Sequence, residues 1–121
     1  MIPKLTGSFG LVSASMATPL AMVLTELLQN AMQHGFPYPA KDDGLLEVAA
    51  VREPERLTVT VADSGVGLPA DFDLDSTTSL GLQIVRTLVV SELGGRLRIS
   101  PRPGGGTEAV LVLPVRNESD R

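Results

Sequence analysis

The stretch from Leu20 to Gly35, LAMVLTELLQNAMQHG, constrains the fold of this chain more than any other part of the sequence. Its apolar side chains recur every three or four residues, which predicts an amphipathic helix with one stripe turned toward a core. We expect the helix over residues 17–34, because Pro19 suits a first helical turn and Gly35 suits a helix end. The predicted buried stripe consists of Leu20, Leu24, Leu27, Leu28 and Ala31.

Four polar residues, Glu26, Asn30, Gln33 and His34, share a different face of this helix. Residues three and four apart are neighbours on a helix, so the pattern gathers a carboxylate, two amides and an imidazole in one small volume. The outer face of an amphipathic helix is usually polar only because it meets water. The helix alone therefore does not distinguish a functional site from a solvated surface.

Length and composition fit one globular domain. The chain has 121 residues, of which 43% are hydrophobic, and a chain of this size can bury a substantial core. Its net charge is −4 and it has no basic cluster. This balance argues against nucleic acid or an anionic membrane surface as the main partner.

Several kinds of site are excluded by residues that the sequence lacks. It contains no cysteine and one histidine, which excludes disulfides, thiolate metal sites and multi-histidine zinc sites. Its apolar runs are far shorter than the roughly 20 residues that span a membrane, and its N-terminus lacks the pattern of a signal peptide. We therefore expect a cytoplasmic domain without direct membrane contact.

Outside the long helix, the pattern predicts a second helix and five short strands. We expect one domain over residues 9–115, between a tail or linker at residues 1–8 and a C-terminal tail at residues 116–121. The order of elements indicates an α+β fold, a two-layer sandwich whose mixed, mostly antiparallel sheet is covered by helices on one face. The predicted strands are residues 9–12, 45–51, 57–61, 96–100 and 108–115, the second and third of which form a hairpin, the second helix is residues 80–93, and residues 71–79 are a surface loop.

The segment DSGVG, residues 63–67, places a carboxylate at the end of a predicted strand. Because Gly65 and Gly67 carry no Cβ, a planar polar ligand could approach the backbone here and hydrogen-bond to Asp63. An ordinary turn of the D-x-G type accounts for these residues equally well. The segment alone leaves both interpretations open.

The second predicted helix begins with Ser79, Leu80, Gly81 and Leu82. A helix N-terminus presents unpaired N–H groups and a partial positive charge, which suit a phosphate. Capping by Ser79 explains the same residues without any ligand. Neither a GxxxxGK[ST] nor a GxGxxG pattern is present, so P-loop and Rossmann sites have no support.

In this order and spacing, these segments resemble the ATP-binding catalytic domain shared by histidine kinases, gyrase-type ATPases, heat-shock chaperone ATPases and MutL. ELLQNAMQHG resembles its N box, DSGVG its first glycine box, and SLGLQIVRTL a shortened second glycine box after an ATP lid. The resemblance covers about residues 9–115 and implies the Bergerat ATP-binding fold. ATPLAMVLTELLQNA, LPADFD and SLGLQIVRTLV are similar to two-component sensor histidine kinases of the actinobacterial PdtaS kind.

The resemblance implies a role for each candidate site residue, with ATP and Mg²⁺ as cofactors. Glu26 would be the catalytic group that orients or deprotonates the attacking atom near the γ-phosphate, and Asn30 would bind Mg²⁺. Asp63 would accept a hydrogen bond from the adenine amine, with Gly67 leaving room for the base and Thr107 adding a water-mediated contact. The other implied nucleotide-binding residues are Gln33, His34, Gly65, Ser79, Leu80, Gly81 and Leu82.

The sequence departs from the usual pattern of these kinases in three respects. The lid is short and lacks GxGxG, and Gln33 replaces a common lysine, which removes one charge from phosphate binding. The sole histidine, His34, lies inside the N box and is a poor candidate for the phosphoacceptor. The resemblance thus implies transfer to a histidine on a dimerisation domain outside this sequence, with a response regulator as a further partner and little turnover by the domain alone.

Two other functions remain open at this point. An anti-sigma-factor serine kinase has the same fold, also uses Glu in the N box, and works as a short single domain. A degenerate domain that serves only as an interaction module is the third possibility, although Glu26, Asn30 and Asp63 are all present. A histidine-bearing helical segment encoded upstream would favour the sensor kinase.

Overall fold

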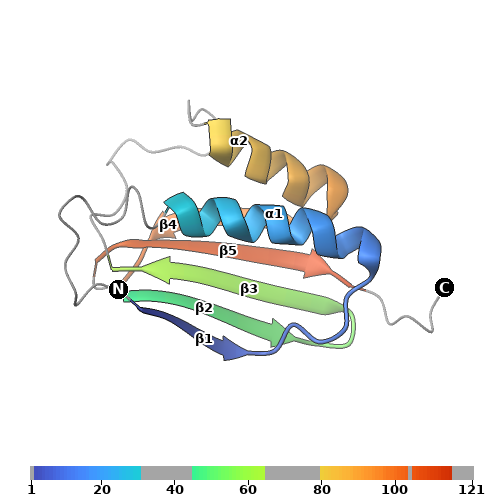
Figure 1. The fold of residues 1–121 in the computed structure, drawn as a ribbon, viewed down its shortest axis with the longest axis horizontal. Helices are drawn as coiled ribbons and strands as arrows, with labels where there is room; N and C mark the ends of the chain where they lie inside the picture. The colour runs from blue at the N-terminus through green and yellow to red at the C-terminus, as the bar shows by residue number, and fades with distance from the viewer. Residues whose placement is uncertain (1, 31–44, 65–79, 104, 116–121) are drawn as a thin grey trace.

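In the computed structural model, residues 2–30, 45–64, 80–103 and 105–115 are described. Five strands form one sheet in the order β1-β2-β3-β5-β4, in which β1 and β2 are parallel and all other neighbours antiparallel. The helices lie on one face of this sheet (Figure 1), which confirms the predicted two-layer α+β sandwich. The elements are β1 (Ile2–Gly7), α1 (Ala14–Asn30), β2 (Leu45–Arg52), β3 (Arg56–Asp63), α2 (Leu80–Thr87), η3 (Leu88–Glu92), β4 (Arg96–Pro101) and β5 (Thr107–Pro114).

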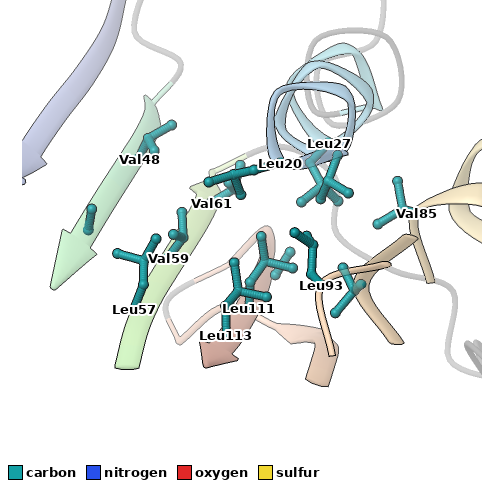
Figure 2. Close-up of a cluster of buried hydrophobic side chains, with 14 of the residues drawn as sticks. Leu20, Leu27, Val48, Leu57, Val59, Val61, Val85, Leu93, Leu111 and Leu113 are labelled. Carbon is teal, nitrogen blue, oxygen red and sulfur yellow. The ribbon is translucent and has the colours of Figure 1, made fainter. Parts of the chain in front are cut away.

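The core lies between the sheet and the helices. Burial alternates along β3, so that every second side chain points toward α1, as expected for a sheet covered on one face. Figure 2 shows side chains of α1, β2, β3, β5 and the second helix converging there. Of the predicted stripe of α1, Leu20 and Leu27 are buried, Leu24 and Leu28 pack at its edge, and the buried Val23 was not predicted.

Helix α1 begins at Ala14, three residues before the predicted start. The carbonyl oxygen of Ser13 accepts hydrogen bonds from the N–H groups of Met16 and Ala17, both at 3.0 Å. Pro19 therefore lies inside the helix rather than in its first turn. Met16 packs against the core and so stabilises the helical turn before Pro19, which the prediction had left out of the helix. Residues 31–34, the predicted end of the helix, lie outside the described residues.

The predictions for the N-terminus were wrong. Residues 9–12 form no strand, and the residues expected to be a tail supply strand β1. Its register with β2 runs from Ile2 opposite Leu45 to Gly7 opposite Ala50. An edge strand tolerates proline because one of its sides needs no hydrogen bonds, which explains how β1 accommodates Pro3. Residues 116–121, the predicted C-terminal tail, lie outside the described residues.

The remaining elements follow the prediction closely. Strands β2 and β3 form the expected antiparallel hairpin, closed by a backbone hydrogen bond from the Glu53 N–H to the Arg56 carbonyl oxygen at 2.7 Å. The second helix continues from α2 into η3, a π-helical turn closed by the N–H of Leu93 on the carbonyl of Leu88. Gly94, with φ of 64°, ends it. No helix within the described ranges is long and apolar enough to cross a membrane.

Candidate functional site

Asp63 ends strand β3 and is the one charged or polar side chain buried within the described residues, with 5% of its surface exposed. It follows Leu57, Val59 and Val61 in the phase of the strand that faces the helices. A buried carboxylate is costly unless hydrogen-bonding groups surround it. The end of β3 therefore places a polar side chain within an otherwise apolar layer.

Thr107 lies directly opposite Asp63 in the register of β3 and β5. Residues opposite each other in an antiparallel pair point to the same face, with Cβ atoms about 4.5–5.5 Å apart. The structure thus brings together two of the predicted site residues, and it places Leu46 of β2 on the other side of Asp63. An apolar wall and a hydroxyl flank the carboxylate, a combination that suits a flat heterocyclic base.

Gly106 lies against Asp63 and was not among the residues predicted for the site. Its φ is +100°, and a Cβ at this position would collide with the backbone carbonyl of Asp63 and lie 2.8 Å from Cα of Ser64. The glycine therefore lets the turn before β5 close tightly over the end of β3. The available signal was the run of three glycines before Thr107, which by itself indicates only a flexible turn.

Replacing Gly106 by alanine should lower the free energy of unfolding by about 1–3 kcal/mol, because a clash with the Asp63 carbonyl adds to the strain of a positive φ; chemical denaturation measures the change. Gly105→Ala is the matched control, because Gly105 has a similar φ of +112° but a Cβ added to it would have no atom within 4 Å. The control should cost less than Gly106→Ala. Equal losses for the two variants would contradict the role assigned to the close approach to Asp63.

Asn30 and Glu26 lie one turn apart on α1, both half-buried. Nδ2 of Asn30 is buried and, among the described residues, has no hydrogen-bond partner. An unpaired buried polar atom costs about 1–3 kcal/mol, so a native structure usually supplies a water, ion or ligand there. Rotation of the amide would present its oxygen at the same place. Asn30 therefore fits the predicted role as an oxygen ligand to a cation.

The N-terminal turn of α2 packs against Glu26. Gly81 faces this side chain so closely that a Cβ on it would lie 2.7 Å from Cδ of Glu26. Leu82 packs against the core, whereas Leu80 is 69% exposed. The remaining predicted site residues lie outside the described residues and their placement stays a prediction: Gln33, His34, Gly65, Gly67 and Ser79.

The described site elements meet at one end of the sandwich. In Figure 1 the end of α1, the end of β3, and the starts of β5 and α2 all lie toward the left of the molecule. An open cavity of about 500 Å³ runs along the outer face of α1 and reaches Glu26. Within the described residues no three His, Cys, Asp or Glu side chains gather to hold a metal ion.

Comparison with protein families identifies the family of this chain. Residues 16–117 match the family described as histidine kinase-, DNA gyrase B-, and HSP90-like ATPase. The chain belongs to this family. Membership in the histidine kinase-, DNA gyrase B-, and HSP90-like ATPases confirms the resemblance found in the sequence.

Curated relatives place the chain near one group within this ATPase family. It is 45% identical over 113 residues to the sensor histidine kinase PdtaS of Mycolicibacterium smegmatis, covering 93% of this chain and 22% of that protein. The PdtaS protein of Mycobacterium tuberculosis is 47% identical over 109 residues, with 90% and 22% covered. The chain thus spans less than a quarter of the length of these relatives.

Solved structures of the ATPase family agree with the fold. The histidine kinase domain of the blue-light activated histidine kinase EL346 from Erythrobacter litoralis superposes with a TM-score of 0.80 at 32% identity, covering 93% of this chain and 54% of that one. The catalytic domain of the histidine kinase ThkA has a TM-score of 0.73 at 22% identity, with 96% and 80% covered. The second likeness shows the shared fold alone.

Proposed function

We propose that this chain binds Mg-ATP and serves as the catalytic domain of a sensor histidine kinase. It would deliver the γ-phosphate to a histidine on a dimerisation domain of a longer parent protein, from which a response regulator would receive it, in the cytoplasm where ATP is available. The identity to two sensor histidine kinases, 45% and 47%, supports this function and favours it over a serine kinase of the same fold.

The buried carboxylate of Asp63 opposite Thr107 is the observation that carries the proposal. A carboxylate held out of water is a strong hydrogen-bond acceptor, and the exocyclic amine of adenine is a donor that fits it. Thr107 would reach the same base edge through a water molecule. Selection of adenine over guanine would then follow from one acceptor placed where guanine presents a carbonyl oxygen.

The phosphates would lie toward Asn30 and the start of α2. Mg²⁺ prefers oxygen ligands and takes most of them from phosphates and water, which agrees with a site to which Asn30 contributes a single side chain. When bound, the ion would offset the negative charge of the phosphates. The first turn of α2, at Leu80 to Leu82, would lie toward the phosphate oxygens, because a helix N-terminus carries a partial positive charge.

Glu26 would act at the transfer step. One imidazole nitrogen of the acceptor histidine forms a bond to the γ-phosphorus, while the bond from this phosphorus to the β,γ-bridging oxygen breaks and its electron pair leaves with ADP. The proton on the other imidazole nitrogen passes to the carboxylate of Glu26, either directly or through one water molecule. Glu26 lies one turn before Asn30 on α1, which supports a position for this acceptor near the proposed phosphate site.

Calorimetric titration of the chain with ADP, with and without Mg²⁺, tests the proposal. We expect ADP to bind and Mg²⁺ to strengthen binding. A folded chain that binds neither ADP nor a non-hydrolysable ATP analogue would overturn the proposed function and leave the degenerate interaction module as the better description.

Asn30→Ala should weaken Mg-ADP binding about tenfold, or ~1.4 kcal/mol, and leave binding without Mg²⁺ nearly unchanged. Because the amide nitrogen of Asn30 has no partner among the described residues, its removal should not lower the melting temperature. Gln29→Ala, at an exposed neighbouring position on α1, is the control and should bind like the wild type. A Mg²⁺ effect that survives in Asn30→Ala would contradict the assigned ligand.

A further inference from the structure

The first turn of α2 leaves no room for a side chain beside Glu26. A Cβ on Gly81 would lie 2.7 Å from Cδ of Glu26 and 3.3 Å from its Cγ, and would collide with Oε2. Non-bonded carbon atoms pack at about 3.5–4.0 Å. With Glu26 in its observed place, position 81 can therefore hold only the bare backbone.

The backbone of Gly81 does not itself demand glycine. Gly94, Gly105 and Gly106 are among the described glycines with positive φ, and Gly81 is not. Gly81 is the second residue of a regular α-helix, where alanine is the more favourable residue. The feature that excludes a side chain here is thus Glu26, not the local conformation.

The Glu26 carboxylate has few other restraints. It is half-buried, and within the described part of the chain no hydrogen bond or ion pair holds it. Glu26 also lines the open cavity along α1, so solvent-accessible space lies beside its side chain. Packing against Gly81 is therefore the contact that the described residues offer to keep the carboxylate in one place.

We propose that Gly81 is a positioning residue for Glu26. The inference rests on the proposed function, in which the Glu26 carboxylate takes a proton from the acceptor histidine. A proton acceptor works within about 2.6–3.2 Å of its donor, and a misplacement of about 1 Å can cost about 100-fold in rate. A methyl group at position 81 pushes the carboxylate out of its place, so that transfer slows while the nucleotide still binds.

The test uses Gly81→Ala in the full-length protein that joins this chain to its histidine-bearing domain. Transfer from γ-labelled ATP to the histidine is expected to slow by about 10- to 100-fold at saturating ATP. Because alanine keeps the backbone N–H through which position 81 would meet the nucleotide, the KM for ATP and the Kd for Mg-ADP should change by less than about threefold. Thr87→Ala is the matched control, because Thr87 is exposed on the same helix and makes no side-chain capping bond. It raises helix propensity as Gly81→Ala does and should keep the wild-type rate.

A double-mutant cycle separates a displaced carboxylate from a distorted helix. Glu26→Asp, which withdraws the carboxylate by one methylene, should slow transfer in the wild-type background. In the Gly81→Ala background it should cause little further loss, since both changes misplace the same group. The Glu26 side-chain carboxyl ¹³C resonance of the chain should also shift in Gly81→Ala and not in Thr87→Ala.

The outcomes separate the two proposals. If the wild type binds no Mg-ADP or transfers no phosphate, the proposed function fails and the role of Gly81 fails with it. If the wild type does both and Gly81→Ala keeps its rate, the positioning role alone is overturned. Weaker Mg-ADP binding in Gly81→Ala at an unchanged transfer rate, or independent effects of the two substitutions in the cycle, would equally overturn it.

Discussion

Replacing Asp63 by asparagine is expected to lower the affinity for ADP about 100-fold, or ~2.7 kcal/mol. The carboxylate is 5% exposed at the end of β3, and we propose that it accepts a hydrogen bond from the adenine amine. A neutral amide of the same shape loses the charge-assisted bond and sets a possible donor against the amine. Calorimetric titration of both proteins with ADP measures the change.

Inosine diphosphate makes this prediction specific to the base. It carries a carbonyl oxygen where ADP carries the amine, so that the wild type should bind it far more weakly and Asp63→Asn should lose most of this preference. Glu108→Gln is the control, because Glu108 lies next to Thr107 in β5 but pairs with Ala62 on the other face of the sheet. Equal wild-type affinity for the two nucleotides would contradict the proposed contact.

Much of the Asp63 position could be predicted from the sequence. The strict alternation of LTVTV in β3 sets which side chains face the core, and continuing this phase by two residues brings Asp63 to the buried face. Its position opposite Thr107 depends on the pairing of β3 with β5, which local pattern does not define. The resemblance to a known family assigned both residues to one site without defining that pairing.

Strand β1 shows where local pattern is insufficient. Pro3 and Gly7 argue against regular structure within a short segment, yet the segment pairs with β2 along its whole length. The hydrogen-bonding groups of β2 that pair with β1 lie more than thirty residues further along the chain. The local sequence of β1 therefore does not reveal them. Such a parallel edge strand is determined by tertiary contact, which outweighs the local preferences.

The relation between Gly81 and Glu26 could not be predicted for the same reason. The helical spacing places Glu26 and Asn30 on one face of α1, and this was visible in the sequence. Which element covers that face depends on how α2 packs against α1, and the sequence of neither helix specifies this packing. The burial of the Asn30 amide nitrogen, which has no partner among the described residues, is likewise a property of packing, since a helical wheel does not distinguish a solvated amide from an enclosed one.

Glu26 is central to the proposed mechanism, in which the acceptor histidine loses a proton as the new bond to phosphorus forms. Its side chain is half-buried on α1, one turn before Asn30, and it packs against the start of α2. A group that takes a proton during transfer contributes about 10²–10⁴-fold to the rate. Such a group contributes little to nucleotide binding, because ADP presents no proton that the group would remove.

Glu26→Gln should therefore slow transfer to the histidine by about 10²–10⁴-fold and leave the Kd for Mg-ADP within about threefold of the wild type. The amide keeps the length of the side chain, so its packing against Gly81 is preserved while the proton acceptor is lost. Single-turnover transfer from γ-labelled ATP measures the rate, and Gln29→Ala, an exposed neighbour on α1, should keep it. Transfer by Glu26→Gln at the wild-type rate would show that the proton goes elsewhere, and a parallel loss of Mg-ADP binding would assign Glu26 to the nucleotide instead.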